Sequence, residues 1–567
     1  MTKVLLIQPV LSSIRAIGEI FEKRNFINFD LKRINFPLGL LHIGSLLDEN
    51  SINTKIIDLD RDLFYYVHDE GVEDKSLTNF LKEYLVDATA LYQPDVIGIS
   101  GNFNCNATFV ERCCEDIKRF NKDIPIVLGG HYPTNCYKEI LTDDLNVDYV
   151  ILGEGEEIMQ DLVNAIVMDN ESLLDNNPGI VTRNNVLNNS ISSKGPAMIG
   201  DLESLPPVNY SILDNIEDYL TSKQDMRTII PRENPDRTVA MMTSRGCSHQ
   251  CTYCASYKVH GKKLRAFSVD RVVDEISDLV GKYDINTIIF EDDLFTYSRK
   301  RTIELSRKIY ESFGNRFFLE FPNGIAVRTL NDEVVYWLAK AGMKQINLAI
   351  ETGNQYVQDV IIKKKLKLEL VKPVVDILKK YDVLVRAYFI VGFPGETIEM
   401  MEDTKDFAKK LKLDWAVFSF ATPIVGSELY ETARINNQLV NDNLDTSTYF
   451  DAQLRSDDWS QDDVARIQEE ANYEVNFLEN YNLVDGKYEK GRLIFEDILH
   501  SYPKHLFGNY CLWRSQIGLG DYTGAEETER TLQEIIETNS SNMALLKKYN
   551  LLNEEPFVKF LTSLSDK

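Results

Sequence analysis

Short runs of β-branched and other apolar residues alternate with helical patterns over residues 1–165. The runs are KVLLIQPV, TKIIDLD, DVIGIS, IPIVLGG and VDYVILGEGE, and amphipathic stretches such as ATFVERCCEDIKRF separate them. Strands that are each followed by a helix pair in parallel, because the helix carries the chain back to the start of the sheet. The alternation therefore predicts a doubly wound, flavodoxin-like parallel sheet with helices on both faces.

Glycine and polar residues follow the predicted strands. In an open parallel sheet, ligands bind outside the carboxyl ends of the strands. Glycine lets a large ligand approach the backbone closely, because it has no side chain. The residues at these strand ends are Ser100, Gly101, Gly129, Gly130, His131, Gly153, Glu154, Gly155 and Glu156. They predict a site for a large ligand at this edge of the sheet.

The middle of the chain divides into two regions. Residues 166–235 are rich in Asn, Pro and Ser, which is typical of a linker, here with one small hairpin. Residues 236–432 resume the alternation, with six strand–helix units. Because eight units close a complete barrel, six predict an open, partial (β/α)6 barrel of the TIM type.

The last region, residues 433–567, shows helical patterns only. The tripeptide Gly-Lys-Tyr at 486–488 recurs as Gly-Asp-Tyr at 520–522, an offset of 34 residues. That offset is the period of tetratricopeptide helix pairs. Two degenerate copies fit a tetratricopeptide-like domain and fit a plain helical cap equally well.

Composition limits the classes of function. The chain has 567 residues, more than one core supports, so about three or four domains are expected. Its formal net charge of −26 repels phosphate backbones and anionic lipid, which disfavours nucleic-acid and membrane-surface partners. There is no apolar run of about 18 residues for a membrane span, and the first strand is too short for a secretory signal. Eight cysteines are sparse for this length and fit a cytoplasmic chain with reduced thiols.

Three cysteines follow the first strand of the predicted barrel. Cys247, Cys251 and Cys254 are spaced Cys-x3-Cys-x2-Cys. A four-iron cluster in an electron carrier is held by four thiolates. Three thiolates leave one iron open to a small molecule, and the amino and carboxylate groups of S-adenosylmethionine can chelate it. The triad stands on the face where such barrels place their chemistry.

Two other interpretations fit the same spacing. Zinc accepts three sulfurs and one nitrogen, so His249 or His260 could complete a zinc site with the triad. The three thiols could also be buried and structural. The spacing favours the open cluster over both.

With an aromatic residue at Tyr253, the triad resembles the signature of the radical S-adenosylmethionine superfamily. Later segments match in order, namely FEDDLFTYSRKR, NLAIETG, VRAYFIVGFPGET and ATPIVGSELYE, and the resemblance covers about residues 236–430. It implies acidic residues near the methionine amine, a glutamate at the ribose hydroxyls and a wall for adenine and ribose. The residues so placed are Tyr253, Glu291, Asp292, Glu351, Phe389, Val391, Gly392 and Thr422. Taken singly, Glu351 could instead cap a turn, and Asp292 and Asp293 could form a solvated strand end.

The first region resembles the cobalamin-binding domain that precedes the radical domain in one branch of that superfamily. The matching pieces are FPLGLLHIGSLL, VIGIS, VLGGHYPT and YVILGEGE. They imply that cobalamin contacts Pro37, Gly39, Thr134 and the strand-end residues named above. None of the seven histidines has Asp two residues before it, so the Asp-x-His-x-x-Gly segment that supplies a cobalt ligand in many such domains is absent. No histidine is therefore expected on the lower face of cobalt. A sheet that holds another nucleotide, or only supports the barrel, is the alternative.

Together the resemblances imply a cobalamin-dependent radical S-adenosylmethionine methyltransferase. Its cofactors would be a 4Fe-4S cluster, S-adenosylmethionine and cobalamin. A 5′-deoxyadenosyl radical would remove hydrogen from an unactivated carbon of a small-molecule or peptide substrate, and methylcobalamin would supply the methyl group. A reducing electron donor such as flavodoxin or ferredoxin is also implied. Two alternatives stay open, a related enzyme that cyclises or rearranges its substrate without methyl transfer and a non-catalytic cobalamin-binding regulator.

Overall fold

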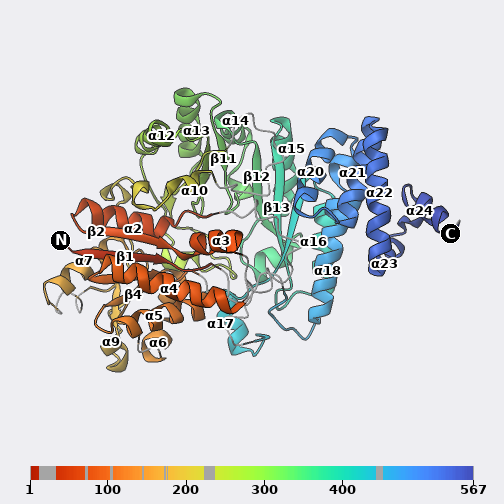
Figure 1. Cartoon of the computed structure of the whole chain (residues 1–567). Coiled ribbons are helices and arrows are strands. Elements are labelled where there is room, and N and C mark those ends of the chain that lie inside the picture. Colours follow the sequence, from red (N-terminus) through yellow and green to blue (C-terminus); the bar gives the residue numbers. More distant parts are fainter. Residues whose placement is uncertain are drawn as a thin grey trace.

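The computed structural model describes residues 2–11, 34–70, 74–102, 106–143, 146–170, 174, 177–221, 236–441 and 451–565. Figure 1 shows an N-terminal sheet with its helices in red and orange, a barrel-like domain in green and cyan, and a helical tail in blue. The predicted fold class is confirmed, since two α/β regions precede an all-α region. Within the described ranges, no helix is long and apolar enough to cross a bilayer.

The N-terminal sheet has the strand order of flavodoxin-like folds. Five parallel strands and one antiparallel edge strand lie in the order β2-β1-β3-β4-β5-β6. Val4 and Leu6 of β1 belong to one hydrophobic core, and Leu5 and Ile7 belong to another on the opposite face. Burial on both faces explains why the first strand is apolar throughout. The bounds are β1 (Lys3–Gln8), β2 (Asn53–Asp58), β3 (Val96–Ser100), β4 (Ile126–Gly129), β5 (Tyr149–Ile151) and β6 (Ile180–Thr182).

Helices cover both faces of this sheet. α2 (Leu38–Glu49) and α7 (Glu156–Val167) pack on one face. The other face is covered by α3 (Leu59–Glu70), α4 (Asp74–Tyr92), α5 (Ala107–Phe120) and α6 (His131–Asp143). This two-sided covering is what a doubly wound sheet requires.

The described part of residues 166–235 holds more structure than the linker predicted there. It forms β6, the short helices α9 (Arg183–Leu187) and α10 (Ile216–Leu220), and two 3-10 turns, η3 (Leu202–Ser204) and η4 (Tyr210–Ile212). The buried Tyr210 donates a hydrogen bond of 2.7 Å to the carbonyl of Ala240, and the buried Tyr219 donates one of 2.8 Å to Asp58 Oδ2. Isolated aromatic anchors of this kind have no periodicity, so the composition of the segment concealed them.

Six parallel strands form the barrel-like domain. They lie in two sheets, β7-β10-β11 and β12-β13-β14, which a parallel bridge between Ile325 and Leu348 connects. The strands are β7 (Thr238–Met241), β10 (Thr287–Phe290), β11 (Phe318–Glu320), β12 (Gln345–Glu351), β13 (Leu384–Val391) and β14 (Trp415–Phe420). The helices after them are α12 (Val269–Tyr283), α13 (Arg299–Phe313), α14 (Asp332–Ala341), α15 (Val371–Lys380), α16 (Ile398–Lys409) and α17 (Glu428–Ile435). The partial barrel of six units is thus present.

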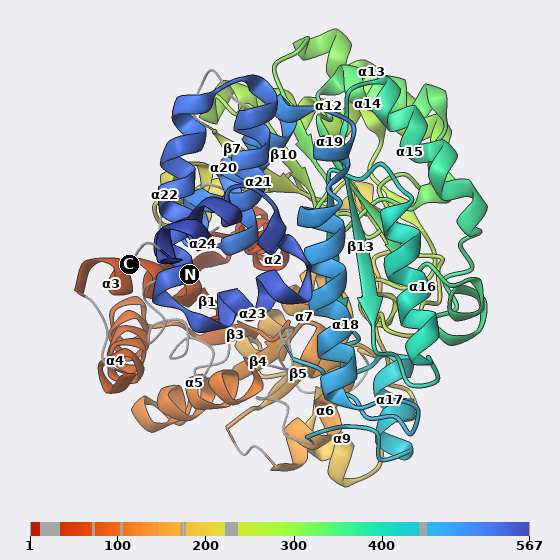
Figure 2. The same cartoon turned by 90° about the vertical axis from the view of Figure 1, so that its right-hand side faces the viewer.

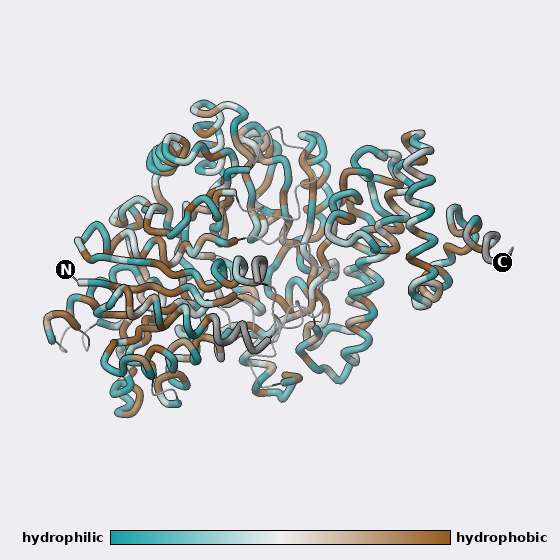
Figure 3. Tube along the Cα trace, in the orientation of Figure 1, coloured by the Kyte–Doolittle hydropathy of each residue, from teal (hydrophilic) through white to brown (hydrophobic). Residues whose placement is uncertain are grey.

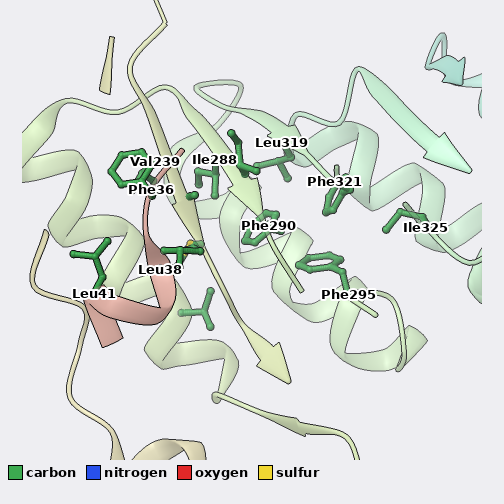
Figure 4. Close-up of a cluster of buried hydrophobic side chains, with 14 of the residues drawn as sticks. Phe36, Leu38, Leu41, Val239, Ile288, Phe290, Phe295, Leu319, Phe321 and Ile325 are labelled. Atoms are coloured by element: carbon green, nitrogen blue, oxygen red, sulfur yellow. The ribbon is translucent and has the colours of Figure 1, made fainter. Parts of the chain in front are cut away.

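One hydrophobic core is shared by the two α/β domains. Figure 4 shows Phe36, Leu38 and Leu41, at and just before the start of α2, beside Val239 of β7 and Ile288 of β10. All five side chains are buried. Because burying apolar area is the main favourable term in association, this shared core fixes how the sheet meets the barrel.

The described part of the tail is mostly helical from Gln461 onward, after an irregular stretch that contains an antiparallel bridge between Leu439 and Leu454. It comprises α18 (Gln461–Tyr473), a π-helical turn η9 (Glu474–Leu478), α19 (Tyr481–Val484), α20 (Tyr488–Ser501), α21 (Leu506–Leu519), α22 (Tyr522–Thr538), α23 (Ser540–Lys548), η10 (Leu551–Asn553) and α24 (Phe557–Ser565). The repeated tripeptide occupies equivalent places, because Gly486 (φ 71°) and Gly520 (φ 78°) each stand two residues before a helix that begins with tyrosine. Figure 2 shows these helices in front of the barrel, and hydrophilic residues mark outer helices such as α22 (Figure 3).

Candidate active site

A cavity of about 780 Å³ lies where the carboxyl ends of the N-terminal strands face the barrel loop that carries the cysteine triad. Its wall combines residues of β1, β3 and β4 with residues of the segment from Arg245 to His260. Predicted cobalamin contacts that line it are Pro37, Gly39, Ser100, Gly129, Gly130, His131, Gly153, Glu154, Gly155 and Glu156. From the triad it is lined by Cys254. The cavity therefore brings the two predicted sites together.

The glycines of this wall leave room for a large ligand. A Cβ built at Gly39 would meet no atom within 4 Å, and one at Gly129 would meet only Ile151, at 3.9 Å. Gly130 (φ 107°) and Gly153 (φ 86°) adopt left-handed backbone that strongly favours glycine. This broad, glycine-lined floor fits the flat face of a corrin.

Two predicted cobalamin contacts support the floor from behind and are not among the cavity-lining residues. Gly101 donates its backbone N–H to the carbonyl of Gly129 at 2.7 Å. Thr134 accepts a hydrogen bond of 3.2 Å from the N–H of Gly153. Both hold the loops whose glycines face the cavity, and direct contact with cobalamin stays a prediction for them.

The carboxylates of Glu154 and Glu156 are bound by arginines of the barrel domain. Arg265 holds Glu154 through two contacts of 2.7 and 2.8 Å, and Arg245 holds Glu156 at 2.5 Å. Burial would raise the pKa of Glu154, but hydrogen bonds from His260 and Arg265 outweigh it and lower that pKa to about 2. The charge of Arg245 likewise lowers the pKa of Glu156 against the effect of burial. These pairs could not be predicted from sequence patterns, because the partner arginines lie in another domain.

Two histidines of the N-terminal domain line the cavity. Burial lowers the pKa of His131 to about 4, with a further contribution from His260, whose ring centre lies 5.8 Å away. Burial lowers the pKa of His42 to about 3, and its Nε2 has no hydrogen-bond partner in the described part of the chain. Both are therefore neutral at pH 7. The predicted absence of a histidine ligand on cobalt stays a prediction.

The cysteine loop is closed at its base by glycine geometry. Gly246 (φ 94°) and Gly261 (φ 74°) permit the sharp turns, and the N–H of Cys247 donates to the carbonyl of Gly261 at 3.1 Å. Burial raises the pKa of Cys254 to about 12 and also raises the pKa values of Cys247 and Cys251. Thiols with raised pKa values become thiolates beside a bound cation, which an iron–sulfur cluster supplies.

The zinc interpretation fits this geometry poorly. Within the described ranges, no group of three or more His, Cys, Asp or Glu side chains is placed to hold a metal ion. A single zinc needs all its ligands within about 2.0–2.3 Å of one point, whereas a four-iron cluster places its thiolates on separate irons. His249 Nε2 lies 2.8 Å from Arg328 and His260 Nδ1 lies 3.4 Å from Glu154, so both rings have other partners.

The acidic stretch after β10 splits between two environments. Asp292 is buried and accepts hydrogen bonds from the N–H and hydroxyl of Thr243, at 2.8 and 2.7 Å, and from the hydroxyl of Ser244. It is neither solvated nor directed to the cavity, and its carboxylate holds the start of the cysteine loop. Glu291 and Asp293 line the cavity instead. Contact with the methionine amine thus stays a prediction that this geometry supports for Glu291 and not for Asp292.

Glu351 ends β12 at an irregularity in the strand register, with φ 73°. Its carboxylate pairs with Lys364 at 2.7 Å, and the same ammonium lies 3.4 Å from the hydroxyl of Tyr253. Left-handed backbone is unfavourable for glutamate, and such strain gathers at functional sites. Lys364 is a charged neighbour of the triad that was not predicted. It lies in a run of three lysines, and such runs are typical of a solvated surface.

The predicted adenine wall lies along β13 and just after the ends of β13 and β14. Phe389 is fully buried and stacks on Phe418 at 5.2 Å between ring centres, and Val391 is buried in the adjoining core. Gly392 (φ 88°) donates its N–H to Glu396 at 2.9 Å, and the hydroxyl of Thr422 donates to the carbonyl of Phe420 at 3.2 Å. None of these four predicted contacts lines the described cavity, so their role toward S-adenosylmethionine stays a prediction.

Comparison with known proteins agrees with this geometry. The sequence model of the B12 binding domain matches residues 25–163, and that of the radical SAM superfamily matches residues 241–408. Cytidylyl-2-hydroxyethylphosphonate methyltransferase of Streptomyces wedmorensis is 30% identical over 425 residues, which is 70% of this chain and 78% of that protein. The chain belongs to the cobalamin-dependent radical S-adenosylmethionine enzymes.

Other known proteins show the range of similarity. The anaerobic magnesium-protoporphyrin IX monomethyl ester cyclase of Rubrivivax gelatinosus is 29% identical over 63% of this chain and 61% of its own length. A similar solved structure is that of the cobalamin-dependent S-adenosylmethionine radical enzyme OxsB with aqua-cobalamin and S-adenosylmethionine bound. The match covers all of this chain and 84% of the OxsB chain. Its TM-score is 0.62 at 15% identity, which shows a shared fold.

Membership of the family gives the cofactors of this enzyme, which are cobalamin, a 4Fe-4S cluster and S-adenosylmethionine. The residues present fit all three. The glycine floor suits the corrin, and the three thiols suit a cluster with one open iron. Glu291 and Asp293 line the same cavity as Cys254.

Proposed function

We propose that this enzyme transfers a methyl group to an unactivated carbon of a small-molecule or peptide substrate. The observation that carries the proposal is the single cavity, which is lined both by the glycine floor of the N-terminal sheet and by Cys254 of the cluster loop. When bound, the cluster with S-adenosylmethionine supplies a hydrogen-abstracting radical, and cobalamin supplies the methyl group. Both must reach one carbon, and a shared cavity allows this.

The side chains of this enzyme position the cofactors and exclude water. Cys247, Cys251 and Cys254 would hold the cluster, and the acidic Glu291 and Asp293 would hold the amino group of S-adenosylmethionine by charge. Apolar residues such as Leu6, Ile99 and Val127 line the floor beyond the glycines. A site that excludes water protects a radical from competing reactions. A site that holds the reactants in the right orientation also supplies much of the rate enhancement.

The enzyme needs electrons from outside, and we propose a low-potential donor such as flavodoxin or ferredoxin. Reduced thiols and an oxygen-sensitive cluster fit the cytoplasm best. The net charge of −26 argues against nucleic acid as a partner.

Cyclisation or rearrangement without methyl transfer is the second candidate, since a cyclase of Rubrivivax gelatinosus is among the relatives. The mass of the product separates the two. S-adenosylmethionine with a labelled methyl group is incubated anaerobically with the loaded enzyme and candidate substrates. Label in the product supports methyl transfer. A substrate-dependent product without label, formed together with 5′-deoxyadenosine, would instead establish the second candidate.

A further inference from the structure

Two arginines stand at the base of the loop that carries the cysteine triad. β8 (Ser244–Arg245) pairs antiparallel with β9 (Arg265–Ala266), and Arg245 lies directly opposite Arg265 in this register. The chain between them, residues 246–264, contains all three cysteines. The orientation of this two-stranded ribbon therefore sets the orientation of the triad.

The ribbon alone carries an unfavourable pair of charges. Like charges directly opposite one another on antiparallel strands repel. The side chains of Arg245 and Arg265 are only 3% and 7% exposed, so water screens this repulsion little. Neutralisation must come from the protein.

The two glutamates that neutralise the ribbon belong to the N-terminal domain. Glu154 follows β5, and Glu156 begins α7; their side chains are 1% and 5% exposed. Arg265 also donates to the carbonyls of Ile199 and His260, at 2.5 and 2.6 Å. The N–H of Ile199 donates to Glu154 at 2.7 Å, which closes the network.

The same four-residue segment, 153–156, lines the cavity on the cobalamin side. Gly153 and Gly155 belong to its floor, while the glutamates that alternate with them reach across to the cluster loop. A movement of either part is thus passed directly to the other.

We propose that Glu154 and Glu156 with Arg265 and Arg245 form an ionic clamp that sets the distance between cobalamin and the cluster. These four are positioning residues. The inference rests on the proposed function only in that both cofactors must be bound. Its consequence is catalytic, because two cofactors that act on one carbon tolerate little displacement, and an error of about 1 Å can cost about 100-fold in rate.

The test measures that distance without any substrate. Protein loaded anaerobically with iron, sulfide and hydroxocobalamin is reduced, and pulsed electron paramagnetic resonance records the coupling between the cobalt(II) and cluster spins. The variant is the double substitution R245Q/E156Q, because removing one partner would leave an unpaired buried charge. We expect both cofactors to load and the distance to shift or spread on the order of 1 Å.

The matched control is R237Q/E217Q. Arg237 and Glu217 form a two-contact pair, at 2.9 and 3.0 Å, that also joins separate segments. Their side chains are 28% and 63% exposed, and neither lines the cavity. We expect it to keep the wild-type distance. If R245Q/E156Q loads both cofactors with the wild-type distance, the clamp is disproved. If R245Q/E156Q loses a cofactor, the variant E156D is measured instead, because it keeps both charges and only shortens the acidic side chain. An unchanged cobalt–cluster distance in E156D overturns the clamp. Wild-type protein that binds no cobalamin or no cluster would overturn the proposed function instead.

Discussion

Asp58 is a buried carboxyl at the end of β2, on the wall of the cavity. It accepts hydrogen bonds from the backbone N–H groups of Asp60 and Arg61, at 3.1 and 3.2 Å, and from the hydroxyl of Tyr219 at 2.8 Å. Burial and the nearby charge of Asp60 nevertheless raise the pKa of Asp58 to about 7. The folded protein therefore holds a proton there that the unfolded chain releases near pH 4.

This shift predicts a pH dependence of stability. Between about pH 4 and 7 the folded state binds more protons at Asp58, so its contribution to stability falls as pH rises through that window. Asp58→Asn removes the ionisation and keeps the shape. Thermal midpoints of the apoprotein should be similar for wild type and D58N at pH 4 and should diverge in favour of D58N up to pH 8, by up to about 4 kcal/mol in unfolding free energy. A constant difference across this range would show that Asp58 is not the titrating group.

Gly39 offers a test of the cobalamin floor. A Cβ there meets no atom within 4 Å, so Gly39→Leu should leave the fold intact while it fills space that the corrin would use. We expect cobalamin affinity to fall at least about 10-fold, since overlap of this kind costs on the order of 1–3 kcal/mol. Iron loading should stay unchanged. Gly281→Leu is the matched control, because a Cβ at Gly281 in α12 also meets no atom within 4 Å. Equal cobalamin binding by both variants would remove Gly39 from the site.

At the residue scale, features that depend on local spacing could be predicted from the sequence. Contacts between residues that are distant in the chain could not. The triad and the glycine floor are local patterns, and the structure places Cys254, Gly39 and Gly129 on one cavity. Asp292 accepts hydrogen bonds from the cysteine loop, whereas the next residue, Asp293, lines the cavity. Two adjacent aspartates look alike in the sequence, so this difference could not be predicted. The partners of Glu154 come from about 110 residues further along the chain.

The edge of the partial barrel is closed by side chains of the tail. An open sheet leaves backbone groups of its last strand without partners. Asn476 of η9 accepts from the N–H of Ala416 and donates to its carbonyl, both at 2.7 Å, and Gln468 of α18 donates to the carbonyl of Phe418 at 2.8 Å. Asn476 thus takes the place of a neighbouring strand, and the tail is part of the barrel's architecture.

Asn476→Ala should leave both backbone groups of the buried Ala416 unsatisfied. Each such group costs about 1–3 kcal/mol, so we expect a loss of about 2–6 kcal/mol and faster hydrogen exchange in β14. Thermal unfolding and exchange mass spectrometry measure these two effects. The exposed Gln461, which donates to the carbonyl of Ala452 from the first turn of α18, provides the control Gln461→Ala. Wild-type exchange in β14 of N476A would mean that another group seals this edge.

Elements were predictable where their periodicity is strong. The strands of both α/β domains are apolar runs bounded by helices, and the 34-residue offset marked two real helix starts at Tyr488 and Tyr522. The edge-capping role of η9 had no pattern to reveal it, since a lone Asn in a helical segment reads as surface. The same holds for Tyr210 and Tyr219 in the predicted linker.

In the whole molecule, the two predicted cofactor sites share one cavity, and two kinds of contact hold the domains that carry them. A hydrophobic core that includes Phe36 and Val239 runs from the sheet into the barrel, and buried ion pairs join the two sides beside the cysteines. The tail completes the barrel on its open side. This arrangement suits chemistry in which two reactive groups act on one substrate carbon in turn.

The most direct test of this account is the anaerobic cleavage of S-adenosylmethionine by reduced, cobalamin-loaded protein. Wild type and the control Cys511→Ala, whose buried thiol lies in the tail, should both form 5′-deoxyadenosine. Cys247→Ala should bind cobalamin normally and form none, because the cluster has lost one of its three thiolates. Iron-loaded wild type that forms no 5′-deoxyadenosine, or Cys247→Ala that forms as much as wild type, would contradict the account.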